Sequence, residues 1–150
     1  MTAALVFSGA VFFMVNNKNE SRRILEIRDS VSGRSYGRWH LEEDGEFAIE
    51  FIHSVNQSPV RETFVIEEGV IRLKKIRFYS FGAGIPSELE ESWIISRDGD
   101  AMVISGFNTS FEEINFIVGT VSDHLFFING ETISLRELCG RNAQITLSFR

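Results

Sequence analysis

Hydrophobic and polar residues alternate along most of the chain after residue 23, which is the pattern of strands with one buried face. Phe47, Ile49 and Phe51 show it most clearly, since each is separated from the next by one residue. Runs of this kind predict strands over residues 24–28, 38–41, 47–53, 60–67, 70–78, 92–96, 101–105, 124–128 and 143–149.

Pairs and triplets rich in glycine separate these runs: 43–45, Glu68-Gly69, Asp98-Gly99 and Asn129-Gly130. Each supplies the positive φ that tight hairpins need. Short strands joined in this way predict a mainly β chain, folded as an antiparallel β-sandwich that is immunoglobulin-like or related.

Two segments predict short helical turns. Residues 109–116 begin with Thr109 and Ser110 before two glutamates, and 134–138 begin with Ser134 as N-cap. Glu137 completes a capping box, and Gly140 is the stop signal. Neither segment is long enough to cross over a parallel sheet.

With 150 residues and 43% hydrophobic content, the chain can bury one substantial core. We expect a single domain over residues 24–150, preceded by an N-terminal segment and linker over residues 1–23. The net charge of −6 and the pI near 5.1 argue against a nucleic-acid partner, which requires clustered Lys and Arg.

Residues 3–15 are all apolar or small, and a polar stretch follows them. This length is short for a spanning helix and closer to the hydrophobic region of a signal peptide. We expect an export or anchor segment, although no Lys or Arg precedes it and Lys18, Arg22 and Arg23 follow it. The alternative is a buried first strand or helix of the domain.

Two ionisable residues, His53 and Glu62, lie on either side of the turn that follows residue 53. His53 shares the alternating face of Phe51, and Glu62 shares that of Phe64, beyond the turn that contains Pro59. If the turn is centred between residues 56 and 57, His53 and Glu62 lie opposite or diagonal to each other. An inward ionisable pair is either a satisfied structural contact or the floor of a pocket.

The stretch around Gly82 and Gly84 leaves backbone N–H groups sterically open, as an anion-binding concavity requires. No lysine or helix pattern follows to complete a nucleotide motif, so a strand-ending turn with a bulge is favoured. Ser54 is no partner for His53, because adjacent strand residues point to opposite faces.

Other candidates are weaker. The single cysteine, Cys139, precludes an intrachain disulfide and is interpreted as a buried small hydrophobe. The three histidines, His40, His53 and His124, lack the spacing that presets metal ligation. We expect no metal and no cofactor, and we interpret Trp39 and Trp93 as core anchors.

Three pieces of the chain, 51–55, 59–62 and 81–86, in this order and spacing, resemble the bacterial domain-of-unknown-function family 1850. The likeness extends from about Trp39 to the C-terminus. The resemblance implies a small extracytoplasmic protein, often encoded beside TRAP-type solute transporters of the TAXI class. It also implies that the characteristic residues are His53, Ser54, Pro59, Glu62, Gly82 and Gly84.

We therefore expect a non-enzymatic accessory or binding module, anchored to the cytoplasmic membrane by residues 3–15. It would support a TRAP-type carboxylate transporter by docking to the membrane subunit or the solute-binding protein, with a small carboxylate as candidate ligand. The alternatives are a hydrolase-like enzyme with His53 as general base oriented by Glu62, and a motif that only pins the turn.

Overall fold

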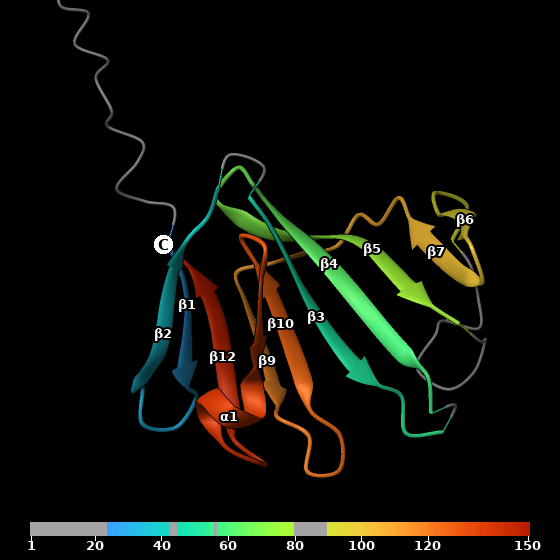
Figure 1. Ribbon diagram of the computed structural model, residues 1–150. Coiled ribbons are helices and arrows are strands. Elements are labelled where there is room, and N and C mark those ends of the chain that lie inside the picture. The colour runs from blue at the N-terminus through green and yellow to red at the C-terminus, as the bar shows by residue number, and fades with distance from the viewer. Residues whose placement is uncertain (1–23, 43–44, 56, 80–89) are drawn as a thin grey trace, which may run out of the picture.

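The computed structural model describes residues 24–42, 45–55, 57–79 and 90–150, which form two antiparallel β-sheets and one short helix (Figure 1). The N-terminal segment of residues 1–23 and the pair Gly82 and Gly84 lie outside the described residues. Within the described part of the chain, no helix has the length and apolarity needed to cross a membrane.

The smaller sheet contains four strands, and its inner face is continuous and apolar. Leu25, Ile27, Ile145 and Leu147 are all fully buried, and each alternates with an outward polar residue. In spatial order the strands are β2 (Ser35–His40), β1 (Ile24–Asp29), β12 (Gln144–Phe149) and β9 (Glu113–Ile117).

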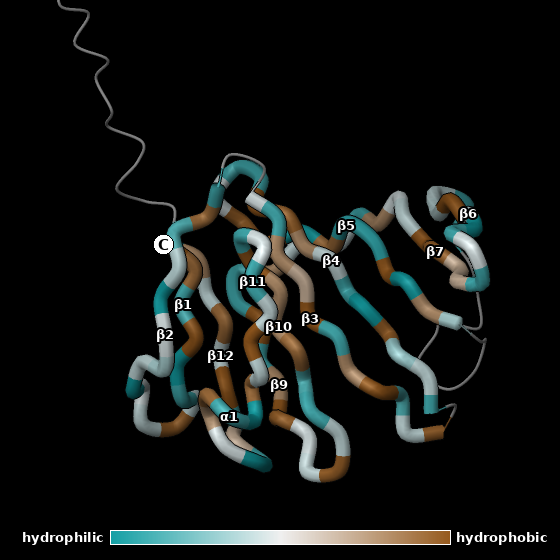
Figure 2. The backbone as a smooth tube through the Cα atoms, in the orientation of Figure 1, coloured by the Kyte–Doolittle hydropathy of each residue, from teal (hydrophilic) through white to brown (hydrophobic). Residues whose placement is uncertain are grey.

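The larger sheet is open and extends past the smaller one on the side of β5, β7 and β6 (Figure 1). Hydrophobic and hydrophilic residues alternate along its strand β3 (Figure 2). Its strands, in spatial order, are β11 (Glu131–Ser134), β10 (His124–Ile128), β3 (Glu46–Ile52), β4 (Pro59–Glu67), β5 (Val70–Phe78), β7 (Ala101–Ser105) and β6 (Ile94–Asp98), with β8 (Ser110–Phe111) paired to β5.

Two hydrophobic clusters form the core. The larger one lies between the sheets, where the Trp39 ring meets the edge of Phe126 at a centroid distance of 5.2 Å. The smaller one is centred on Phe78 and Ile104, and Trp93 packs against it. Both tryptophans are therefore core anchors, as predicted.

The mainly antiparallel β fold with two sheets is confirmed, whereas the finer comparison with immunoglobulin folds stays a prediction. The predicted helix over residues 109–116 is wrong, because the chain there forms β8 and β9. Ile114 and Phe116 pack on the larger cluster, while Glu113 and Asn115 point to the other face. This period of two outweighs the capping signal at Thr109.

The second predicted helical turn is confirmed as α1 (Leu135–Cys139). The Ser134 hydroxyl accepts a hydrogen bond of 3.0 Å from the backbone N–H of Glu137, as an N-cap does. Gly140 follows with φ of 97° and donates its N–H to the Arg136 carbonyl. Fully buried Leu135 fixes the helix against the core.

The Asn129-Gly130 pair joins β10 to β11 as predicted. Both residues have positive φ, 50° and 76°, which is the signature of a type I′ turn. A Cβ atom on Gly130 would have no heavy atom within 4 Å, so the requirement for glycine comes from the backbone alone.

Replacing Gly130 with Val should lower the free energy of unfolding by about 1–2 kcal/mol, the cost of left-handed backbone for a non-glycine residue. Chemical denaturation measures it. Glu131→Val, at the neighbouring exposed strand position, is the control and should stay within roughly 0.5 kcal/mol of the parent. Equal stability of Gly130→Val and the parent would contradict the turn assignment.

Candidate functional site

His53 lies just after the end of β3 and organises the turn that leads to β4. Its N–H donates to the Ser58 carbonyl and its carbonyl accepts from the Gln57 N–H, both at 2.9 Å. Its Nδ1 accepts a hydrogen bond of 3.2 Å from the N–H of Val55. Nδ1 therefore caps the turn, which places the proton of the neutral ring on Nε2.

Ser54 and Pro59, the other motif residues near this turn, have positions that the backbone geometry explains. Ser54 is exposed, and its carbonyl accepts from the Gln57 side-chain amide at 2.6 Å. Pro59 is the first residue of β4 and pairs with Ile52, a position at which a strand tolerates proline. Gly82 and Gly84 lie outside the described residues, so their predicted role near the turn stays a prediction.

The predicted contact between His53 and Glu62 is wrong. Glu62 pairs with Ile49, which lies four residues from His53 along the chain, or roughly 13 Å of extended strand. The two residues are therefore neither opposite nor diagonal. A general base at His53 oriented by the Glu62 carboxylate has no geometric basis.

The register explains this difference. Phe47 lies opposite Phe64, with stacked rings whose centroids are 5.3 Å apart. The register expected from the sequence would have placed Phe64 opposite Phe51 or beside it, which also joins two apolar rings. The sequence pattern allows both pairings, and the six-residue turn from His53 to Ser58 accompanies the observed one.

Glu62 itself faces inward, as its parity predicted. It lies between Ile49 and Ile76 in the pairing of β3, β4 and β5, where the two hydrophobic clusters meet. No described residue forms a hydrogen bond or an ion pair with its carboxylate, and burial raises the pKa of Glu62. The position is costly for a charge and offers no catalytic partner among the described residues.

His124 is the first residue of β10 and packs between two aromatic rings. Its ring stacks near Phe51 and Phe116, each with a centroid distance of 5.6 Å, and Nδ1 accepts from the Gly119 N–H at 3.0 Å. Burial lowers the pKa of His124, which keeps the ring neutral near pH 7. In the described part of the chain, no group of three His, Cys, Asp or Glu residues could hold a metal ion.

Cys139 ends α1 and is partly buried. Burial raises the pKa of its thiol to about 11, so the thiolate is scarce at neutral pH. Its position agrees with the interpretation of Cys139 as a packed, unreactive residue.

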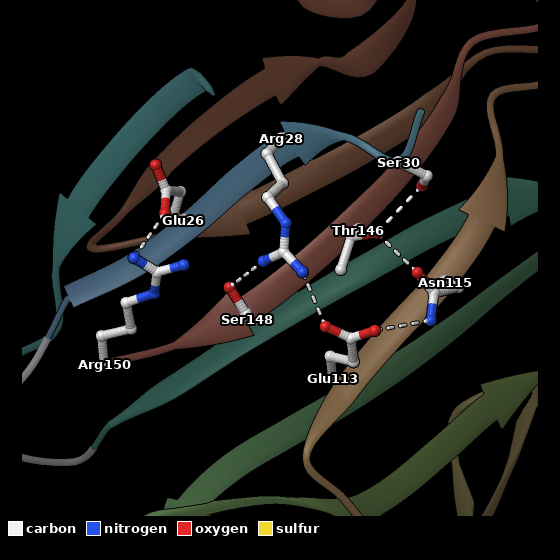
Figure 3. A network of polar contacts seen from close by, with 8 residues as sticks. All are labelled: Glu26, Arg28, Ser30, Glu113, Asn115, Thr146, Ser148 and Arg150. Atoms are coloured by element: carbon white, nitrogen blue, oxygen red, sulfur yellow. Dashed lines mark hydrogen bonds and ion pairs between the residues drawn. The ribbon is translucent and has the colours of Figure 1, made fainter. Parts of the chain in front are cut away.

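A polar network covers the outer face of the four-stranded sheet (Figure 3). Arg28 donates to Ser148 at 2.8 Å and to Glu113 at 2.7 Å, and Thr146 donates to Asn115 at 2.6 Å. Ser148 and Thr146 are buried although they face outward, because these longer side chains cover them. The polar groups satisfy one another, which identifies the network as structural.

The same sheet carries an ion pair in which the carboxylate is buried and the arginines are exposed. Glu26 is 4% exposed, and its carboxylate accepts a hydrogen bond of 2.8 Å from Arg38 while Arg150 lies 3.9 Å away. The Arg38 hydrogen bond holds the pKa of Glu26 below its ordinary value. This carboxylate is compensated, in contrast to Glu62.

The larger sheet carries a hollow on its outer face that the sequence analysis missed. The hollow has a volume of about 560 Å³, and its floor is formed by alternate residues of β3, β4 and β5, among them Ala48, Arg61, Thr63, Lys75 and Arg77. Because inward and outward residues alternate, these are the neighbours of the core residues along each strand. The sequence pattern therefore predicts a polar outer face for these strands, but it does not predict that this face is concave.

A β-bulge contributes to this curvature. Thr63 pairs with Lys75 and Phe64 with Leu73, so Lys74 is an extra residue in β5. Bulges bend the strand and increase its twist. Lys74 also forms an ion pair with Glu46 on β3, which bridges across β4 at this point.

We expect His53→Leu and Glu62→Leu to act additively on the free energy of unfolding, with a coupling below about 0.5 kcal/mol, because the residues are far apart. A double-mutant cycle by urea denaturation measures it. Phe47→Leu with Phe64→Leu is the positive control and should couple by about 0.5–1.5 kcal/mol. A coupling above roughly 1 kcal/mol would show that His53 and Glu62 interact directly and would contradict the observed register.

Glu62→Gln should gain stability relative to the parent as pH rises. The pKa of Glu62 is higher in the folded parent than in the unfolded chain, so the protonated carboxyl favours folding. This contribution to the unfolding free energy of the parent is complete below the unfolded pKa and is lost as pH rises through the folded pKa. Unfolding free energies from pH 3 to pH 8 test this.

Glu113→Gln is the opposite control, because the hydrogen bond from Arg28 lowers the pKa of Glu113. It should lose stability relative to the parent as pH rises. Parallel pH profiles for Glu62→Gln and the parent would show that the Glu62 carboxyl is not desolvated.

Residues 47–135 match the family described as Domain of unknown function (DUF1850). This range includes β4, β5, the turn at His53, all of β3 except Glu46, and the lining of the hollow except Glu42 and Glu46. No curated protein and no solved structure matches the chain. The matched segment covers more than half of the sequence and contains the motif residues that carried the resemblance. The chain therefore belongs to the DUF1850 family.

Proposed function

We propose that the protein is a non-enzymatic binding module whose binding surface is the hollow on the outer face of the eight-stranded sheet. The observation that carries this proposal is the combination of a concavity of about 560 Å³ with a lining of basic, acidic, hydroxyl and apolar side chains. Ligand sites combine a concave shape with a few convergent polar groups.

The place of action that we propose is the outer side of the cytoplasmic membrane, with residues 3–15 as the anchor. The apolar character of this segment supports the proposal. The partner that we propose is a TRAP-type transporter, either its membrane subunit or its solute-binding protein, as the family resemblance implies. The protein would support carboxylate uptake by binding rather than by catalysis.

Site-specific photo-crosslinking in cells that contain the transporter tests the partner. A photoreactive amino acid at exposed Glu131, on the rim of the hollow, should form an adduct with a transporter component. The same amino acid at Val31, which is 82% exposed and lies after β1 of the other sheet, is the control and should give no such adduct.

Immunoblotting and mass spectrometry of the adducts identify the partner. Absence of a transporter adduct from position 131, in cells where the photoreactive protein is present at its normal level, would overturn the transporter association. Equal adduct yields from positions 131 and 31 would overturn the assignment of the partner surface to the hollow.

A further inference from the structure

Four side chains form a compact block on the floor of the hollow. Arg61 pairs with Arg77 and Thr63 pairs with Lys75, so two residues of β4 face two residues of β5 on the same side of the sheet. Directly opposed residues have Cβ atoms about 4.5–5.5 Å apart. We call these four residues the oxyanion block.

The block has one more cation than its neighbours neutralise. Arg61 forms an ion pair with Glu50 at 2.8 Å, and Arg77 forms one with Asp98 at 3.1 Å. Lys75 is exposed and forms no ion pair with any described residue. Since Glu50 and Asp98 already compensate Arg61 and Arg77, the positive charge of the block that is left for a bound anion is that of Lys75.

The Thr63 hydroxyl is available to a ligand in the hollow. Thr63 is only 7% exposed, yet its hydroxyl forms no hydrogen bond with any described residue. It lines the hollow opposite Lys75 and next to Arg61 on the same face of β4. Among the described residues, only Arg136 Nε is a fully buried side-chain atom without a partner, so the Thr63 hydroxyl reaches solvent in the hollow and would donate there to a ligand oxygen.

The rest of the hollow indicates which group a ligand would carry beside its oxyanion. Ala48 pairs with Thr63 on one side and with Phe127 on the other, so an apolar half continues the same cross-strand row. Glu42 and Glu131 lie at the far end and are exposed. They would repel a second anionic group, whereas a short apolar tail fits over Ala48, beside the Phe127 ring that the Arg61 guanidinium covers at 3.9 Å from its centroid.

We propose that the oxyanion block binds a small organic anion with one oxyanion head and a short apolar tail. The head accepts hydrogen bonds from Thr63 and from Lys75, the one cation of the block that no described carboxylate neutralises. Carboxylate and phosphate heads share this chemistry, and titration with each of them separates the two. The inference rests on the proposed function, because it assigns a ligand class to the same hollow.

Amide-detected NMR titration of the purified full-length chain tests the proposal, with butyrate, succinate, inorganic phosphate and chloride at matched ionic strength. Butyrate should shift the amide signals of β4 and β5 saturably, with a dissociation constant of about 1 mM, as expected for so small a ligand. Succinate should bind at least about threefold more weakly, because of Glu42 and Glu131. Tighter binding of phosphate than of butyrate would identify a phosphate head, and the reverse a carboxylate head.

Lys75→Gln should weaken binding about tenfold by removing a charged donor. Thr63→Val, which is isosteric, should weaken it several-fold and leave thermal stability equal or higher, because the hydroxyl has no partner in the described structure. Arg97→Gln removes the same charge from exposed β6 outside the hollow and should change nothing.

Shifts produced equally by chloride, or equal affinity in Lys75→Gln, Thr63→Val and Arg97→Gln, would overturn the proposal. A Thr63→Val protein that loses stability would show that the hydroxyl already has a partner. The purified protein contains no transporter, so failure here would leave the crosslinking result intact. A missing crosslink would equally leave the anion site intact.

Discussion

The stacked pair of Phe47 and Phe64 fixes the register between β3 and β4, and the positions of the other groups in the site depend on it. A slip of one residue would exchange the two faces of either strand. The observed register turns Glu62 to the inner face of the sheet and turns Arg61 and Thr63 to the hollow. On the outer face, the ion pair between Arg61 and Glu50 supports the same alignment.

The two sheets differ in how the outward-facing threonines Thr146 and Thr63 are hydrogen-bonded. Thr146 is 3% exposed and is held by hydrogen bonds to Ser30 and Asn115, so its burial is compensated within the protein. Thr63 is buried to a similar degree without such a partner among the described residues. The first arrangement completes a structure, whereas the second leaves a hydroxyl that lines the hollow, where we propose that a ligand binds.

Much of the fold could be predicted because alternation and turn residues act locally. Asn129 and Gly130 specify their own hairpin, and Ser134 specifies the start of α1. The segment at Ile114 and Phe116 was misassigned because a capping signal and a short alternation overlap there. The inward position of Glu62 followed from parity alone.

The site could not be predicted to the same extent, because it depends on relations between strands. The contact of His53 with Glu62 required a register that the apolar pattern left open. The oxyanion block required both that register and the bulge at Lys74, which no local signal indicated. The alternation of Arg61 and Thr63 with core residues was visible, but it did not reveal which residues of β5 lie opposite.

The position of Glu62 also has a consequence for cooperativity. Its carboxyl interrupts the apolar row between Ile49 and Ile76, at the seam between the two hydrophobic clusters. The part of the sheet formed by β5, β7 and β6 therefore shares less apolar surface with the sandwich than a continuous row would provide. Such a seam separates units that open with different free energies, so this part of the sheet is set to exchange its amide protons sooner than the layer around Phe126.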